Sequence, residues 1–193
     1  MDNTIRNCSA DEALQKLING NQMYLAQNKN TGDISDKIRM TTHDEGQHPY
    51  AIIVGCSDSR AIPEVIFNAG IGDLFVIRVA GNVIDRHQLG SIEYAADHLG
   101  TNLVVVLGHD HCGAVDAAIN HDPDGHIGYL VKEIRTAIGN ETNEFRACCL
   151  NARHSVRMIE ENADIMHLKE ERGLKIISAI YHIDSGKVDF ERE

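Results

Sequence analysis

The chain has 193 residues and a formal net charge of −11, from 18 basic and 29 acidic side chains. This length suits one domain around one core, and the acidic balance argues against nucleic-acid binding, which needs basic surface to neutralise phosphates. No apolar run approaches the roughly 18 residues that a membrane span requires, and the first residues lack the apolar stretch of a secretory signal. Five cysteines at irregular spacing favour a reducing compartment, so we expect a cytoplasmic protein.

Residues 1–46 predict a helical arm. Ser9 and Glu12 form the S-x-x-E pattern of a capping box ahead of spaced apolar residues, so we expect a helix over about 10–27. A polar segment follows, with one short helix over about 34–42. The first helix has no preceding strand to cross over from. Such a helix packs on another subunit or on its own chain, and the sequence alone does not decide between the two.

Residues 47–193 predict the core, in which strands and helices alternate. Apolar, β-branched runs and a turn signal at Asp184–Lys187 predict five strands, over 50–55, 73–79, 102–107, 174–183 and 188–190. Helical patterns occupy the intervals, over 63–70, 89–99, 112–119, 127–138 and 144–170. This alternation predicts an α/β fold with a mainly parallel central β-sheet flanked by helices. We expect residues 1–193 to form a single domain.

Two of the predicted strands end in segments that carry reactive side chains. Cys-Ser-Asp-Ser-Arg follows the first strand at 56–60, and His-Asp-His-Cys follows the third at 109–112. The carboxyl ends of parallel strands meet at one edge of a sheet, where ligands bind, so both segments point to one crevice. Two Cys and one His are a ligand set of catalytic zinc, which keeps a fourth position open. The sequence therefore predicts zinc on Cys56, His109 and Cys112.

Alternative ligands remain open at this point. His109 and Cys112 converge if the chain turns at the strand end, which Gly108 and Gly113 would permit. His111 could replace His109, although its position next to Cys112 makes a shared tetrahedral geometry harder. In the simplest alternative, the cysteines are buried free thiols and the histidines have no ligand role.

Asp58 and Arg60 stand beside the expected ligands. The guanidinium fork pairs with carboxylates through two hydrogen bonds, so Arg60 would hold Asp58 ionised and oriented. Such a carboxylate can accept a proton from water or hydroxide on the metal, or it can ligate the metal itself. The alternative is a loop salt bridge of small energetic value.

These motifs together resemble the β-class carbonic anhydrases. The pattern is Cys-x-Asp-x-Arg at 56–60, Arg-x-x-Gly-Asn at 78–82 and His-x-x-Cys at 109–112, and the resemblance extends over nearly the whole chain. It implies one zinc ion per chain and reversible hydration of carbon dioxide to bicarbonate and a proton by attack of zinc-bound hydroxide. Position by position, it implies Cys56, His109 and Cys112 as zinc ligands and Asp58 and Arg60 as a catalytic dyad.

The resemblance also implies a substrate pocket, as in the plant-type branch of the family. Gln47 stands where that branch has a glutamine that hydrogen-bonds substrate across a dimer interface, and Phe75, Val79 and Tyr94 would form the pocket walls. Another branch has a tryptophan of a regulatory bicarbonate site where this chain has Ile53, and the chain contains no tryptophan. We therefore expect no regulatory site of that kind.

The family forms dimers, often paired into larger oligomers, so the resemblance implies a homodimer or dimer of dimers with the active site at the subunit interface. The N-terminal helical extension would then pack on the dimer partner. Two other functions stay possible. One is hydrolysis of carbonyl sulfide or carbon disulfide at the same zinc site, and the other is a non-catalytic zinc or nucleotide-binding module. The latter is disfavoured because no G-x-G-x-x-G or P-loop follows the first strand.

Overall fold

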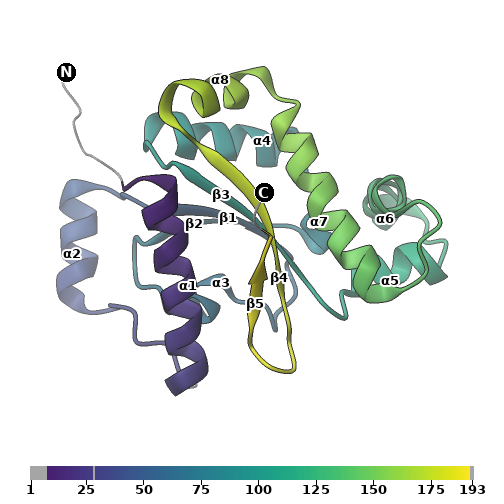
Figure 1. The fold of residues 1–193 in the computed structure, drawn as a ribbon, viewed down its shortest axis with the longest axis horizontal. Helices are drawn as coiled ribbons and strands as arrows, with labels where there is room; N and C mark the ends of the chain where they lie inside the picture. The colour runs from purple at the N-terminus through teal and green to yellow at the C-terminus, as the bar shows by residue number, and fades with distance from the viewer. Residues whose placement is uncertain (1–7, 28, 192–193) are drawn as a thin grey trace.

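A computed structural model of the chain describes residues 8–27 and 29–191. One five-stranded sheet has the order β2-β1-β3-β4-β5, in which β1 to β4 are parallel and β5 is antiparallel to β4 (Figure 1). The strands are β1 (Ala51–Gly55), β2 (Leu74–Arg78), β3 (Leu103–His109), β4 (Lys175–Tyr181) and β5 (Val188–Phe190). The α-helices are α1 (Ala10–Gln27), α2 (Asp36–Glu45), α3 (Pro63–Ile66), α4 (Arg86–Glu93), α5 (Gly113–Asn120), α6 (Gly125–Ile138), α7 (Glu144–Glu160) and α8 (Ala163–Arg172). A 3₁₀ turn, η1 (Ala80–Asn82), and a π-helical turn, η2 (Tyr94–His98), complete the elements.

Helices cover both faces of the sheet, which confirms the predicted α/β class. Alternate residues of β1 and β3 point to opposite faces, and all of them are buried. On one face they pack against α1 and α3. On the other face they pack against α4, α7 and α8. Burial on both sides explains why these strands consist of continuous β-branched residues rather than alternating polar and apolar ones.

Helix α1 lies on the sheet of its own chain. The predicted capping box is present, because Ser9 N–H donates to Glu12 Oε2 at 2.8 Å and Glu12 N–H donates to Ser9 Oγ at 3.3 Å. The side chains of Ala13 and Leu17 are fully buried against β1, β3 and β4 residues. The arm and the sheet therefore share one core, and packing of the arm on a dimer partner remains a prediction.

The observed element boundaries differ from the predicted ones at two informative places. The predicted helix over 144–170 is two helices, because Asn162 caps α8 by accepting the N–H groups of Asp164 and Ile165 and so starts a new helix. Strand β3 continues to His109, which pairs with Tyr181 of β4. His109 therefore ends the strand instead of following it, and the strand itself fixes its direction.

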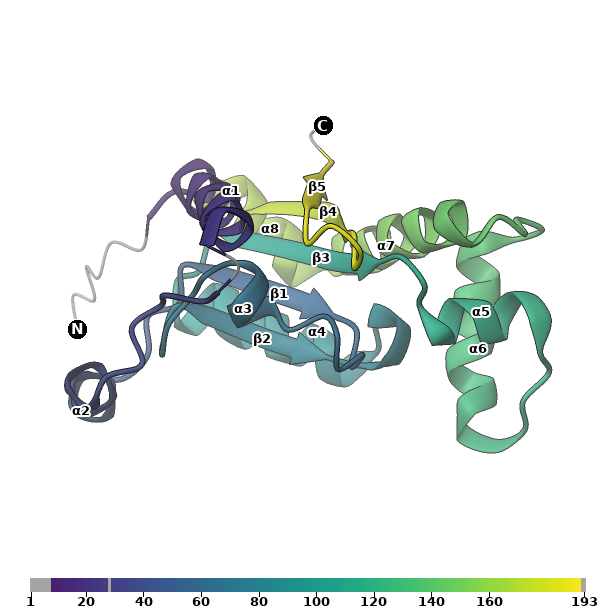
Figure 2. The same ribbon diagram turned by 90° about the horizontal axis from the view of Figure 1, so that it is seen from below.

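Helices α5 and α6 extend beyond the carboxyl ends of the strands (Figure 2). With the start of α7 they form a third apolar cluster, which contains both Cys56 and Cys112. Helices α5, α6 and α7 therefore pack at the carboxyl end of the sheet, where the two reactive segments lie. Within the described residues, no helix is both long and apolar enough to cross a membrane.

Candidate metal centre

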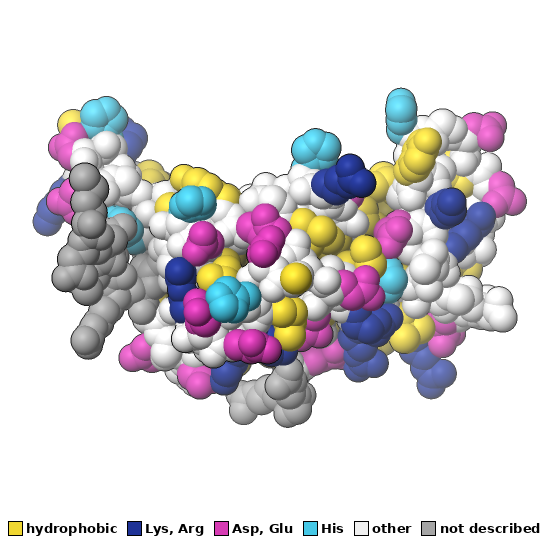
Figure 3. Space-filling view, turned by 90° about the horizontal axis from the view of Figure 1, so that it is seen from above, with side chains coloured by type: hydrophobic (Ala, Val, Ile, Leu, Met, Phe, Trp, Pro, Cys, Tyr) yellow, Lys and Arg dark blue, Asp and Glu magenta, His cyan; other side chains and the backbone are white. Residues whose placement is uncertain are grey.

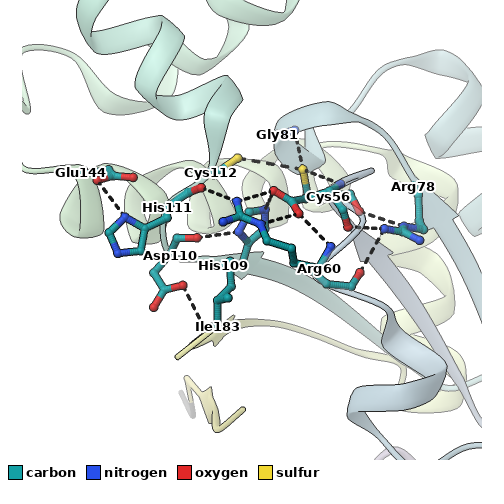
Figure 4. Close-up of polar contacts among 12 residues, drawn as sticks. Cys56, Arg60, Arg78, Gly81, His109, Asp110, His111, Cys112, Glu144 and Ile183 are labelled. Atoms are coloured by element: carbon teal, nitrogen blue, oxygen red, sulfur yellow. Dashed lines mark hydrogen bonds and ion pairs between the residues drawn. The ribbon is translucent and has the colours of Figure 1, made fainter. Parts of the chain in front are cut away.

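Cys56, His109 and Cys112 converge at the carboxyl end of the sheet (Figure 4). Cys56 follows β1, His109 ends the neighbouring strand β3, and Cys112 precedes α5. One ligand atom from each residue lies within 4.8 Å of the others, and the two sulfur atoms are 4.0 Å apart. All three side chains are buried. Adjacent parallel strands thus bring together residues that are more than fifty positions apart.

The imidazole of His109 is oriented as a metal ligand. Its Nδ1 hydrogen-bonds the carbonyl oxygen of Asp110 at 2.7 Å. Its Nε2 is buried and has no hydrogen-bond partner among the described residues. Metal-binding histidines are held in this way, with one ring nitrogen fixed by a carbonyl group and the other presented to the ion. An orphaned buried nitrogen beside two thiols fits zinc, which accepts two Cys and one His in catalytic sites.

The two thiols are unequal. The pKa of Cys56 is lowered to about 4, chiefly because Cys112 donates a hydrogen bond to it. His109 also contributes, as do the backbone N–H groups of Gly81 and Asp58 at 3.3 and 3.4 Å. The same interaction, with burial, raises the pKa of Cys112. These contacts favour the thiolate form of Cys56, which is the form that binds metals.

Asp58 and Arg60 form the predicted pair. Arg60 donates from Nε to Asp58 Oδ1 at 3.0 Å and from Nη2 to Oδ2 at 2.7 Å, and its backbone N–H also reaches Oδ1 at 2.9 Å. These bonds lower the pKa of Asp58 to about 2. Asp58 Oδ2 lies 3.9 Å from His109 Nε2. An ionised carboxylate of fixed orientation thus lies beside the ligand cluster.

Arg78 fixes the loop that carries Cys56 and Asp58. Its Nε donates to the carbonyl oxygen of Cys56 at 2.9 Å, and its Nη2 donates to those of Asp58 and Ala61 at 2.6 and 3.1 Å. In the sequence, Arg78 was noticeable only as part of a motif. The structure gives it a defined task, which is to satisfy three carbonyl groups after the end of β1.

The turn between His109 and Cys112 is made by His111, and the expectation that Gly108 and Gly113 permit it was wrong. Neither glycine has a positive φ, whereas His111 has φ +48°. Gly108 is instead closely packed, since a Cβ there would lie 2.9 Å from Ile180 Cδ1 and 3.3 Å from Ala152 Cβ. The side chain of His111 is 73% exposed, pairs with Glu144 at 3.4 Å and lies outside the ligand cluster. The alternative in which His111 replaces His109 is therefore not the arrangement found.

The four residues expected to line the substrate pocket fall into two groups within one chain. Val79 packs with Cys56 at the metal end of the sheet. Phe75 and Tyr94 lie together at the other end, with ring centroids 6.2 Å apart, and Tyr94 shares a pocket of about 600 Å³ with Gln47. Phe75 pairs with a residue four positions before Cys56, a separation of roughly 13 Å along the strands.

Two further polar residues near the centre were not singled out in the sequence. Asn151 and Ser155 of α7 are both 1% exposed and hydrogen-bond the backbone of the turn that contacts Cys56. Their signal in the sequence is a polar pair at i, i+4 within the apolar face of a helix.

Comparison with known proteins supports the resemblance to the β-class carbonic anhydrases independently of the geometry of the site. The family model described as carbonic anhydrase matches residues 51–188. Carbonic anhydrase 2 of Mycobacterium tuberculosis is 40% identical over 153 residues, which cover 74% of this chain and 74% of that protein. A tetrameric β-carbonic anhydrase of Sordaria macrospora superimposes with a TM-score of 0.71 at 25% identity, over 80% of this chain and 90% of that one. The chain belongs to the β-carbonic anhydrases.

Other members of the carbonic anhydrase family agree. The carbonic anhydrase of Mycolicibacterium smegmatis is 35% identical over 162 residues, covering 78% of this chain and 79% of that protein. The β-carbonic anhydrase CafA of Aspergillus fumigatus has a TM-score of 0.70 at 26% identity, over 94% and 89% of the two chains. Zinc is therefore the cofactor of this carbonic anhydrase, and the Cys56, His109 and Cys112 cluster fits it.

Proposed function

We propose that this carbonic anhydrase catalyses the reversible hydration of carbon dioxide to bicarbonate and a proton, with zinc held by Cys56, His109 and Cys112. The observation that carries the proposal is the buried nitrogen of His109, presented beside two sulfur atoms and the Arg60-bound carboxylate of Asp58. When bound, zinc supplies a Lewis acid that makes water nucleophilic near neutral pH. Three protein ligands leave a position open for that water.

We assign Asp58 the role of orienting the attacking oxygen. An ionised carboxylate accepts hydrogen bonds and cannot donate them. Asp58 therefore accepts a hydrogen bond from the O–H group of the nucleophile, which turns a lone pair of that oxygen toward the carbon of the substrate. Arg60 keeps Asp58 in this state because it binds both carboxylate oxygens. As attack proceeds, a C–O bond forms, one C=O bond becomes single, and negative charge passes to the bicarbonate oxygens.

We further propose that the pocket is completed by a second copy of the chain. Carbon dioxide is small, neutral and apolar, and Val79 is the only one of the four expected pocket residues at the metal end of its own chain. Gln47, Phe75 and Tyr94 would then line the partner's site. Tyr94 is 47% exposed, and the residues Leu74–Ile77 of edge strand β2 are only half-buried. Figure 3 shows a hollow between the lobe that carries α2 and the centre of the molecule. An open apolar strand edge of this kind supports pairing with another copy.

We also propose a cytoplasmic location. All five cysteines are free thiols in the structure, and a thiol-rich protein without disulfides suits a reducing compartment.

The first test is carbon dioxide hydration by stopped flow at mildly alkaline pH, with zinc content measured on the same sample. We expect rapid turnover with about one zinc per chain, which Cys56→Ser abolishes. Cys149→Ser is the matched control, because Cys149 is a free thiol outside the ligand cluster. Zinc without hydration, but with hydrolysis of carbonyl sulfide or carbon disulfide, would replace the proposed reaction. A protein with neither zinc nor turnover would refute it.

The second test asks whether the two chains share a site. A Cys56→Ser chain is co-expressed with a Gln47→Ala/Tyr94→Ala chain, so that one site in a mixed dimer carries neither defect. Activity should appear that neither parent dimer has. Co-expression of Cys56→Ser with Cys112→Ser is the control, since each metal set is then damaged. If the first mixture is as inactive as the control, the pocket residues serve their own chain.

A further inference from the structure

The turn η1 brings a backbone N–H group to the sulfur of Cys56. Gly81 has φ +69° and Asn82 has φ +44°, so two successive residues adopt the left-handed conformation. The N–H of Gly81 donates to Cys56 Sγ at 3.3 Å. A Cβ at Gly81 would lie 2.8 Å from Ile134 Cδ1. Gly81 suits this conformation because it has no Cβ, and Asn82 is one of the few other residue types that tolerate it. The turn is tightly packed, and contacts to its carbonyl groups hold it in place.

Helix α7 supplies those contacts. Asn151 Nδ2 donates to the carbonyl oxygen of Gly81 at 2.7 Å, and Ser155 Oγ donates to that of Asn82 at 2.9 Å (i, i+4 on one helical face). A serine within a helix commonly bonds the carbonyl group four residues earlier. Here Ser155 reaches the turn instead. Both side chains are 1% exposed, so their loss would leave buried carbonyl groups without these donors.

The same face of α7 also contacts the segment that carries the other sulfur ligand, Cys112. Cys148 packs with Cys112 in one apolar cluster and is buried about one helical turn before Asn151. Residues 148, 151 and 155 have the spacing of one helical stripe. A single helix face thus hydrogen-bonds the turn beside Cys56 and packs beside Cys112.

We infer that Asn151 and Ser155 are positioning residues for the metal ligand Cys56, which they serve by holding the Gly81 N–H group on its sulfur. The inference rests on the proposed function only in so far as the cluster binds a metal. An N–H···S bond withdraws electron density from a thiolate and fixes its lone pairs. Outer partners of this kind typically change metal affinity by 10–100-fold when they are removed.

The test uses Asn151→Leu, which keeps the approximate size of the side chain and removes the donor, and Ser155→Ala, which removes one hydroxyl. Ile159→Val is the matched control, because Ile159 is fully buried on α7 and packs in an apolar cluster that contains none of the metal ligands. Zinc affinity is measured by competition with a chromophoric chelator. The sulfur-to-metal charge-transfer band is recorded after Co²⁺ substitution.

Each of the first two variants should bind zinc about tenfold more weakly and shift the charge-transfer band to longer wavelength, because the sulfur is richer in electrons. Ser155→Thr keeps the hydroxyl and should restore both properties, and Ile159→Val should change neither. Affinity lost without a band shift, or no change in either, would overturn the inference. Wild-type protein that binds both metals but does not hydrate carbon dioxide would refute the proposed function and leave this inference standing. If Asn151→Leu fails to fold, Ser155→Ala decides.

Discussion

The left-handed conformation of His111 gives a prediction that the structure makes quantitative. With φ +48°, its carbonyl oxygen accepts a hydrogen bond from Arg60 Nη2 at 3.0 Å. The residue therefore links the two reactive segments, since Arg60 in turn holds Asp58. Replacing His111 by Gly, Ala and Val changes how readily the backbone adopts this conformation and removes the imidazole in all three. The exposed contact with Glu144 thus cancels in any comparison among them.

A residue with a Cβ costs roughly 1–2 kcal/mol in this region. Glycine avoids that cost. However, glycine gives the unfolded chain more conformational freedom, which lowers the free energy of unfolding by about 0.4–1 kcal/mol. We therefore expect His111→Gly to be about 1 kcal/mol more stable than His111→Ala. A β-branched side chain is an outlier here, and strain of this kind reaches about 3 kcal/mol. His111→Val should accordingly be about 1–2 kcal/mol less stable than His111→Ala.

Urea unfolding of the zinc-loaded variants measures these differences, and stopped-flow hydration measures the effect on the site. If His111→Val relieves its strain by turning the carbonyl group away, Arg60 loses an acceptor that contributes about 1.5 kcal/mol, and kcat/KM falls about tenfold. His111→Gly should keep wild-type activity. Equal stability and equal activity of the Gly and Val variants would refute the role assigned to this conformation.

Three further changes test other parts of the molecule. Leu17→Ala should lower the free energy of unfolding by about 2–5 kcal/mol, because the side chain is fully buried on its own sheet; a loss near zero in urea titration would place α1 elsewhere. Arg60→Lys keeps the charge but not the two-pronged contact, so kcat/KM should fall at least about tenfold with zinc content unchanged, and full activity would contradict the orientation of Asp58. Arg153 lowers the pKa of Glu191 below 4.5, so the pair stabilises the fold above that pH and the contribution is lost as pH falls through the lowered pKa. The stability difference between wild type and Arg153→Gln should therefore shrink from about 0.2–1 kcal/mol at neutral pH toward zero in acid, and a pH-independent difference would contradict this.

The metal ligands could be predicted from the sequence because their convergence follows from local order. Cys56 and His109 lie at the carboxyl ends of two adjacent parallel strands, and β-branched runs identify such strands. Cys112 is three residues after His109, so only the conformation of one short turn remained to be predicted. That turn was assigned to glycines because left-handed residues other than glycine are rare. The burial of Gly108 against Ile180 depends on β4, which lies far away in the chain.

The partners of the turn at Gly81 could not be predicted in the same way. Asn151 is 70 residues away from Gly81, and its side chain reaches the turn only because α7 packs against the sheet. A buried polar residue in a helix has many possible partners, and the sequence does not choose among them. The break within the predicted helix over 144–170 was also not predictable from the sequence. The apolar pattern continues past Asn162, and only the observed cap shows that α8 is separate.

Gln47, Phe75 and Tyr94 raise a different question, because within one chain they lie far from the metal ligands. They lie together near the amino ends of the strands, while Cys56 lies at the carboxyl end. A catalytic zinc needs an open position together with walls that exclude bulk water. One chain brings together the three buried ligands, whereas Gln47 and Tyr94, which we propose as walls, lie at the other end of the sheet. Under that proposal, the metal and its walls meet only if a second copy places its Gln47 and Tyr94 over this metal centre. The distance between the two groups within one chain is therefore the strongest physical reason to expect activity only in an assembled oligomer.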